Sequence, residues 1–351
     1  MMKLMRKGLG LAQRVLQTIL GQTIYGYIAG LCNYVFYQKN PIVMILYVLL
    51  AGGGFFVYVK IGFDKYLPGP YVGEIHKTTG TIIMLLCYLS FYVAVQSDPG
   101  VITKSNVLQA LRRYQYDDII YFKNNECKTC KFSKPARSKH CALCNVCVEK
   151  FDHHCIWLNN CVGLKNYRWF ITFVLMHALI CIYGGILGIF IFAGIIKKER
   201  LWEQKFQIMG TGETIEPGLY VISRYLFYSE TAFAFVTILC ICMGIMLTGF
   251  GLYHVNLAMN NVTTNESYKR AAFETYFEEK IDFLEQWKEF GDGFKFEERE
   301  KKLFEVDEKW TKQQVESSIK KTKERQKVNI ANFYKPWSKW ESFKSVFNPP
   351  L

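Results

Sequence analysis

Four long blocks without a charged residue divide this chain, and they constrain its fold more than any other feature. They cover residues 41–59, 78–96, 169–196 and 231–253, with lengths of 19, 19, 28 and 23 residues. A transmembrane helix needs about 20 apolar residues to cross the hydrocarbon core of a bilayer. Four such blocks are hard to bury inside a soluble protein of 351 residues. We therefore predict an all-α integral membrane protein with a four-helix transmembrane bundle.

The first 40 residues are less apolar and carry a strong charge bias. They contain five basic residues and no acidic one, and polar side chains such as Gln13, Gln17 and Asn33 interrupt the apolar stretch at 11–37. This pattern predicts a basic amphipathic helix that lies on a membrane surface with anionic lipids. A fifth membrane span over residues 11–37 is the alternative.

The distribution of charge predicts the topology. Residues 97–168, between the second and third blocks, hold 12 lysines and arginines against 6 acidic residues. Such an excess marks the cytosolic side of a membrane protein. With four spans, the N-terminus and the C-terminal tail are then cytosolic as well. The net charge of +13 is largely a membrane signature, and no nucleic-acid reader motif accompanies it.

Five segments follow from these observations. Residues 1–40 form the basic N-terminal segment, and residues 41–96 hold the first two membrane helices. Residues 97–168 form a cytosolic cysteine-rich domain, and residues 169–253 hold the last two membrane helices. Residues 254–351 form a cytosolic tail, which is dense in charge and for which we expect helices.

The cysteine-rich domain concentrates the metal-binding side chains. Seven of the 12 cysteines and three of the 6 histidines lie between Cys127 and Cys161. Because the cytosol is reducing, clustered cysteines there indicate metal binding or catalysis rather than disulfides. Eight of the donors suffice for two tetrahedral zinc sites, each with three cysteines and one histidine. Spacing alone leaves open whether each site takes consecutive or interleaved ligands.

Two further donors, His153 and Cys155, are left over. A thiolate is a strong nucleophile, and a histidine two residues away can accept the thiol proton. Asp152 would hold the imidazole in the correct tautomer, as the carboxylate does in hydrolytic triads. We therefore interpret Cys155 as a catalytic nucleophile, with His153 as its base. The alternative is that both residues are spare zinc ligands.

Residues 127–170 resemble the cysteine-rich domain of the DHHC-type protein S-acyltransferases. The resemblance rests on the Asp-His-His-Cys run at 152–155 and the Lys-Pro-Ala-Arg-Ser-Lys-His-Cys run at 134–141. Two outlying motifs agree, Asp-Pro-Gly at 98–100 and Thr-Thr-Asn-Glu at 263–266. The four-span layout with a cytosolic domain between spans two and three is also that of the family.

The resemblance implies which ligands share a metal ion. One zinc ion would take Cys127, Cys130, His140 and Cys147. The other would take Cys141, Cys144, His154 and Cys161. The sites then interleave along the chain, and Cys155 stays free of metal.

The resemblance also implies the reaction. Cys155 would be acylated by a long-chain acyl-CoA such as palmitoyl-CoA and would pass the chain to a cysteine of a protein substrate, in ping-pong order. Thr264 would hydrogen-bond to Asp152, and Trp157 would line the mouth of the acyl cavity. Three cations of the cysteine-rich domain are candidates for binding the CoA phosphates, although each of them is also consistent with a solvated surface charge: Arg137, Lys134 and Lys139.

The expected partners are the lipid bilayer and membrane-associated proteins with juxtamembrane cysteines. Within the family, the runs at 134–141 and 157–161 resemble the fungal branch that acts on SNAREs of vesicle fusion. We expect an endomembrane location, in the endoplasmic reticulum or the Golgi. In the tail, Asn332-Phe333-Tyr334 resembles the family's aromatic motif, but the Asp and Gly that usually follow are absent.

Two other classes of function are alternatives. A zinc-stabilised membrane adaptor with an idle Cys155 would act by binding alone. A membrane thiol oxidoreductase would need a metal-free resolving cysteine close to Cys155, and the sequence offers none without breaking a zinc site. The intact motifs at 152–155 and 263–266 favour the acyltransferase.

Overall fold

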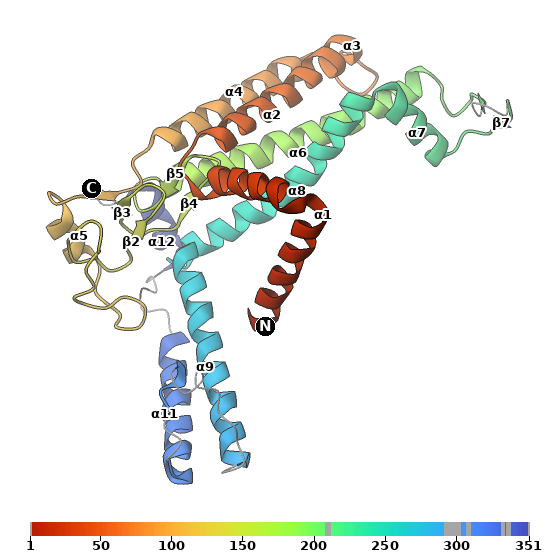
Figure 1. Ribbon diagram of the computed structural model, residues 1–351. Coiled ribbons are helices and arrows are strands. Elements are labelled where there is room, and N and C mark those ends of the chain that lie inside the picture. The colour runs from red at the N-terminus through yellow and green to blue at the C-terminus, as the bar shows by residue number, and fades with distance from the viewer. Residues whose placement is uncertain are drawn as a thin grey trace.

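The computed structural model describes residues 2–207, 212–290, 303–306, 310–330, 334 and 338–349, and it is mostly helical (Figure 1). Within these residues, four helices are long and apolar enough to cross a membrane. Three of them are α4 (Ile75–Gln96), α6 (Tyr167–Lys198) and α8 (Thr231–Met259). The fourth is the continuous helical segment Ile42–Tyr66. The predicted four-helix membrane architecture is therefore confirmed.

The first membrane helix is longer than its charge-free block. It consists of α2 (Ile42–Val57), the π-helical turn η1 (Tyr58–Phe63) and the short α3 (Asp64–Tyr66). Lys60, which ends the block in the sequence, forms an ion pair with Asp64 one helical turn further on, at 3.3 Å. Both side chains are more than half exposed, so the charge of Lys60 remains solvated and the helix continues past it.

Helices α6 and α8 approach each other closely along small residues. A Cβ atom added to Gly188 would lie 2.5 Å from the side chain of Thr237, and one added to Gly185 would lie 2.8 Å from Ile241. Membrane helices associate mainly by van der Waals packing, and glycine lets two backbones come near enough for it. This contact sets the position of α8 and therefore of the residues that follow it in the sequence.

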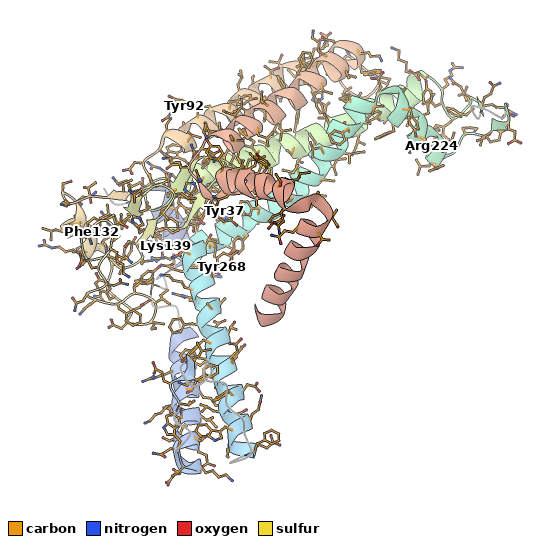
Figure 2. All side chains as sticks on the ribbon, viewed as in Figure 1. Tyr37, Tyr92, Phe132, Lys139, Arg224 and Tyr268 are labelled. Atoms are coloured by element: carbon orange, nitrogen blue, oxygen red, sulfur yellow. The ribbon has the colours of Figure 1, made fainter. Side chains whose placement is uncertain are left out.

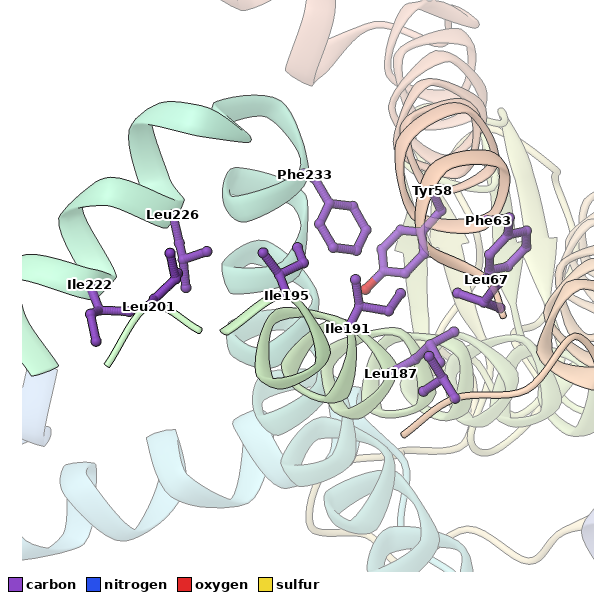
Figure 3. Packing of buried hydrophobic residues seen from close by; sticks show 11 residues of the cluster. Tyr58, Phe63, Leu67, Leu187, Ile191, Ile195, Leu201, Ile222, Leu226 and Phe233 are labelled. Carbon is purple, nitrogen blue, oxygen red and sulfur yellow. The ribbon is translucent and has the colours of Figure 1, made fainter. Parts of the chain in front are cut away.

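A buried cluster closes the end of the bundle that lies far from the cysteine-rich domain (Figure 3). The rings of Tyr58 and Phe233 are 5.1 Å apart, and the Tyr58 hydroxyl donates to the Gly184 carbonyl. Helix α7 (Leu219–Ser229) adds Ile222 to this cluster. The strands β6 (Phe206–Gln207) and β7 (Thr214–Ile215) form a hairpin beyond it.

The cysteine-rich domain occupies the opposite end of the bundle, so that Lys139 and Arg224 mark the two ends in Figure 2. It lies between α4 and α6, over residues 97–166, and includes α5 (Val107–Arg113). Five short strands give it order: β1 (Val101–Ile102), β2 (Lys139–Cys141), β3 (Val146–Val148), β4 (His153–Cys155) and β5 (Asn160–Val162). They form one antiparallel sheet of order β1-β3-β2 and one antiparallel ribbon of β4 and β5.

The two ends of the chain are helical. Helix α1 (Met2–Tyr37) is kinked at Gly21, whose φ is 74°, and it is not among the four candidate spans. In the tail, α9 (Thr264–Phe290) and α11 (Lys312–Ile330) pack into a hairpin that extends away from the bundle (Figure 1). The last helix, α12 (Lys339–Phe347), packs on the bundle, where the hydroxyl of Ser342 donates to the Ala258 carbonyl at 2.6 Å.

Candidate active site and metal centres

Two groups of four side chains are arranged as metal centres. In the first group, His140 Nδ1 lies 3.5, 3.4 and 3.7 Å from the Sγ atoms of Cys127, Cys130 and Cys147. In the second, His154 Nδ1 lies 3.6, 3.4 and 3.7 Å from the Sγ atoms of Cys141, Cys144 and Cys161. Within each group, all donor atoms lie within 4.8 Å of one another.

These distances fit tetrahedral zinc. With Zn–S bonds of about 2.3 Å and Zn–N bonds of about 2.0–2.1 Å, the S···N edge of a tetrahedron is about 3.6 Å. The Sγ atoms of Cys161 and Cys144 are 3.6 Å apart, close to the S···S edge of about 3.8 Å that the same bond lengths give. Three cysteines and one histidine are a common donor set of structural zinc sites. Each group therefore fits one zinc ion.

Strand alternation explains why the two groups interleave along the chain. His140 and Cys141 are neighbours on β2, so their side chains point to opposite faces and join different groups. Across the sheet, His140 pairs with Cys147 of its own group. A site of consecutive ligands would need His140 and Cys141 to share a face, and the pleat of a strand forbids that.

The same alternation separates the Cys155 thiol from the metal donors. On β4, His154 faces Cys161 of the paired strand, which is its partner in the second group. The residues on either side of it, His153 and Cys155, therefore share the opposite face. Cys155 is only 6% exposed and belongs to an apolar cluster with Phe91 at the end of α4 and Phe170 on α6.

Asp152 and His153 form the hydrogen-bonded pair that the acid–base interpretation requires. The Nδ1 atom of His153 lies 2.7 Å from Asp152 Oδ2. Burial opposes a charge on His153, but the hydrogen bond to Asp152 and the contact with the Cys155 side chain outweigh it and raise the pKa of His153 to about 9. The site therefore favours an imidazolium next to the thiol, which is the species formed when His153 accepts the thiol proton.

Thr264 holds the carboxylate of Asp152 in place. Its backbone N–H donates to Oδ1 at 2.7 Å, and its hydroxyl donates to Oδ2 at 2.8 Å. Burial alone would raise the pKa of Asp152, but the bonds from His153 and Thr264 hold it below its ordinary value. The hydrogen bond expected between Thr264 and Asp152 is thus present, and it connects the start of α9 to the strand that carries Cys155.

The Thr-Thr-Asn-Glu motif forms the cap of α9. The N–H of Thr263 donates to Glu266 Oε2 at 2.9 Å, and the N–H of Glu266 donates to the Thr263 hydroxyl at 3.2 Å. This reciprocal arrangement is a capping box, which satisfies backbone donors at the first turn of a helix. It fixes the orientation of Thr264, the residue between them that contacts Asp152.

Arg137 is placed differently from the expectation that it contacts CoA. Its side chain is fully buried, with Nε 2.6 Å from Glu266 Oε1 and Nη2 2.7 Å from Glu266 Oε2. Its remaining donors reach the side chain and the carbonyl of Asn261 at 3.1 and 2.7 Å. The rings of Tyr114 and Tyr334 lie 5.1 and 4.5 Å from the guanidinium carbon. With these contacts, Arg137 joins the cysteine-rich domain to the start of α9, and this burial favours a structural role.

The other predicted contact residues lie nearer the surface. Lys139 is exposed, and its Nζ lies 5.2 Å from the Phe151 ring. Lys134 is half-buried, and its carbonyl accepts a hydrogen bond from the Tyr116 hydroxyl at 2.9 Å. Trp157 is 45% exposed, two residues beyond Cys155. In the tail, Tyr334 contacts Arg137, whereas Asn332 and Phe333 lie outside the described residues.

One residue near the site was not singled out from the sequence. His254 on α8 is 2% exposed, and its ring centre lies 6.0 Å from that of His153. In the sequence it is an isolated histidine directly after the fourth apolar block, with no other candidate metal donor nearby. The local signal is aromatic: Phe250, one helical turn earlier, and the adjacent Tyr253 have rings 4.6 and 5.4 Å from its own.

The chain is similar to one known protein family and to several curated palmitoyltransferases. The model of the "DHHC palmitoyltransferase" family matches residues 120–271. "Palmitoyltransferase swf1" of Schizosaccharomyces pombe is 49% identical over 149 residues, which is 42% of this chain and 40% of that protein. "Palmitoyltransferase ZDHHC4" of Rattus norvegicus is 30% identical over 263 residues, 73% of this chain and 71% of that protein. "Palmitoyltransferase SWF1" of Neurospora crassa is 32% identical over 291 residues, 81% of this chain and 65% of that protein.

Proposed function

The chain belongs to the DHHC palmitoyltransferase family and is a protein S-palmitoyltransferase, and we propose that the acyl group passes through a thioester on Cys155. The observation that carries this proposal is the arrangement around one strand. His153 shares a face of β4 with Cys155 and is hydrogen-bonded to Asp152, while His154 turns to the metal group on the other face.

In the proposed reaction, the Cys155 thiol gives its proton to the ring of His153, which Asp152 orients. The thiolate attacks the carbonyl carbon of the acyl-CoA thioester, the bond from that carbon to the CoA sulfur breaks, and the CoA thiolate takes the proton from His153. In the second half, a substrate cysteine loses its proton to His153 and attacks the carbonyl carbon of the acyl-Cys155 thioester. The bond from that carbon to Cys155 Sγ breaks, and the Cys155 thiolate takes the proton back from His153. Exchange of one thioester for another is nearly balanced in energy, so catalysis depends on orientation.

The position of Cys155 at the end of the bundle suits a lipid substrate. Its apolar neighbours, such as Phe91 and Phe170, belong to membrane helices α4 and α6. A palmitoyl chain gains about 0.8 kcal/mol for each CH₂ that leaves water. The palmitoyl chain of the acyl-CoA therefore partitions into the bilayer, and its thioester group stays at the membrane surface. Trp157, which is half-exposed and lies two residues beyond Cys155 in the sequence, is proposed to line the mouth of the acyl site.

Two zinc ions are proposed to hold the cysteine-rich domain together, one in each group of donors. Zinc supplies folding free energy here rather than chemistry, because all four positions of each tetrahedron are taken by protein ligands. The exposed Lys139 and the half-buried Lys134 are the proposed contacts for the phosphates of CoA.

Further proposals concern place and partners. The basic cysteine-rich end of the bundle faces the cytosol, together with both termini, and the membrane is that of the endoplasmic reticulum or the Golgi. The substrates are membrane-associated proteins with cysteines near the bilayer surface, including SNAREs. The charge of residues 97–168 supports the orientation, and the resemblance of the runs at 134–141 and 157–161 to the fungal SNARE-directed branch supports the substrate class.

The test uses the purified full-length protein in detergent with alkyne-tagged palmitoyl-CoA. The parent should acquire a label that hydroxylamine removes, and Cys155→Ser should acquire none while it keeps two zinc ions per chain. Cys242→Ser, which alters an exposed cysteine of α8, is the matched control and should be labelled like the parent. Persistent hydroxylamine-sensitive label on Cys155→Ser would refute the proposal, and an unlabelled parent would indicate an adaptor.

A further inference from the structure

A second histidine lies behind the proposed base. His254 comes from α8, it belongs to neither metal group, and the reaction proposed above does not use it. Its ring is enclosed by aromatic rings, with Phe170 at 4.8 Å and Phe250 at 4.6 Å, both nearly perpendicular to it. A fully buried imidazole needs a hydrogen-bond partner, and among the described residues a tyrosine of the neighbouring helix provides it.

Tyr167 fixes the orientation of the His254 ring. The Tyr167 hydroxyl lies 3.0 Å from His254 Nδ1 and 3.2 Å from the His254 carbonyl oxygen. The hydroxyl carries a single proton, so when it donates to the carbonyl, Nδ1–H donates to the hydroxyl oxygen. Whether the hydroxyl donates to Nδ1 or to the carbonyl, the hydrogen bonds connect the imidazole to the first turn of α6, directly after the cysteine-rich domain.

Phe170 connects this pair to the active site. Its ring contacts both histidines, 4.9 Å from His153 at 73° and 4.8 Å from His254 at 77°, and the two histidine rings lie 6.0 Å from each other. Tyr167 stacks on the same ring, at 6.1 Å and 23°. Phe170 is 2% exposed, so it can move only if one of these neighbours moves.

The orientation of the His153 ring depends on the contact with Phe170. The bond from Nδ1 to Asp152 fixes one atom of the ring but leaves rotation about that bond. The edge-to-face contact with Phe170 restricts this rotation and so limits the orientations of the ring on the face of β4 that also carries Cys155. When His153 takes up the thiol proton, an aromatic ring at this distance also stabilises the cation.

We propose that Tyr167 and His254 are positioning residues of the acyl-transfer reaction, which act on His153 through the ring of Phe170. This inference rests on the proposed role of His153 as the base. In this proposal, the contact between α6 and α8 not only packs the bundle but also fixes the plane of the His153 imidazole.

The test measures pre-steady-state acylation of Cys155 with palmitoyl-CoA in the purified full-length protein. The burst amplitude counts the active sites, and the burst rate constant reports the chemistry. Tyr167→Phe removes only the hydroxyl and should lower the rate constant about three- to tenfold, as expected for one lost hydrogen bond, with an unchanged KM for palmitoyl-CoA. The burst amplitude and the zinc content should stay at the parent values.

Tyr253→Phe is the matched control. Its ring also lies near His254, at 5.4 Å, but the contacts of the described residues include no hydrogen bond from its hydroxyl to that histidine. It should acylate at the parent rate. A burst rate constant for Tyr167→Phe equal to that of Tyr253→Phe would overturn the proposal, and so would a loss confined to burst amplitude, because that would show a purely structural role.

His254→Gln, which removes the ring, should lower the burst rate constant at least as much as Tyr167→Phe. If this variant loses zinc and does not fold, the result for Tyr167→Phe decides alone. Failure of this inference is distinct from failure of the proposed function, because the latter would show as labelling of Cys155→Ser, whatever the variants at Tyr167 and His254 do.

Discussion

The buried ion pair between Arg137 and Glu266 offers the sharpest test of how the catalytic domain is held on the bundle. Both side chains are fully buried, and two hydrogen bonds of 2.6 and 2.7 Å join them. Burial works against ionisation of Glu266, but Arg137 outweighs it and holds the Glu266 pKa below its ordinary value. Glu266→Gln keeps the size of the side chain and the oxygen that caps α9, but it leaves the guanidinium without a counter-charge.

The expected loss is large because no solvent reaches the guanidinium. Removal of one partner of a buried ion pair costs about 3–5 kcal/mol of unfolding free energy. We expect the lower end, about 3 kcal/mol, because Asn261 and the rings of Tyr114 and Tyr334 still contact Arg137. At roughly 2–4 °C per kcal/mol, the melting temperature should fall by about 6–12 °C.

The assay is a tryptophan-fluorescence melt in detergent, run beside Glu278→Gln as control. Glu278 is exposed on the same helix, and its variant should stay within about 0.5 kcal/mol of the parent. The double variant Arg137→Leu with Glu266→Leu should be less damaged than the sum of the two single changes, since no unpaired charge remains in it. Equal melting temperatures for Glu266→Gln and Glu278→Gln would refute the reasoning.

Three further outcomes are expected. Asp152→Asn should lower the acylation rate of Cys155 by about 10²-fold or more, because an amide no longer holds His153 in the correct tautomer; a rate near that of the parent in stopped-flow labelling would contradict this. Thr264→Val removes one of its two bonds to Asp152 and should cost about 1 kcal/mol in the barrier, a roughly fivefold slower acylation, whereas Thr264→Ser should restore the rate. Cys141→Ser should lower the zinc content below two per chain and the melting temperature as well, and an unchanged zinc content in elemental analysis would show that the ligand groups are wrong.

The membrane helices were predictable because a bilayer imposes a simple requirement on the sequence. A block of about 20 apolar residues is needed wherever the chain crosses, and each of the four blocks became a helix. The helix ends were less predictable: the first span continues past Lys60 to Tyr66, because a lysine at the end of a helix can keep its charge in water. The structure places the eight expected metal donors in two groups, and strand alternation supplies the reason that spacing alone lacked.

Contacts between segments that are distant in the sequence were not predictable. Arg137 looks like a surface cation in a basic segment, and only its partner 129 residues later shows that it is buried. His254 looks like a stray histidine directly after a membrane block, and only the fold places Tyr167 and Phe170 against it. In both cases the residues close by in the sequence carry no information about the distant partner. Rules based on propensity or spacing therefore cannot identify that partner.

The alternation along β4 has a consequence for assembly. If β4 slipped by one residue against β5, every side chain would change face, and His154 would leave its donor group while His153 and Cys155 turned toward it. In a ribbon with this wrong register, Cys155 would lie on the metal-binding face and His154 would not. Zinc binding by all eight donors would therefore stabilise only the register in which Cys155 lies outside both donor groups.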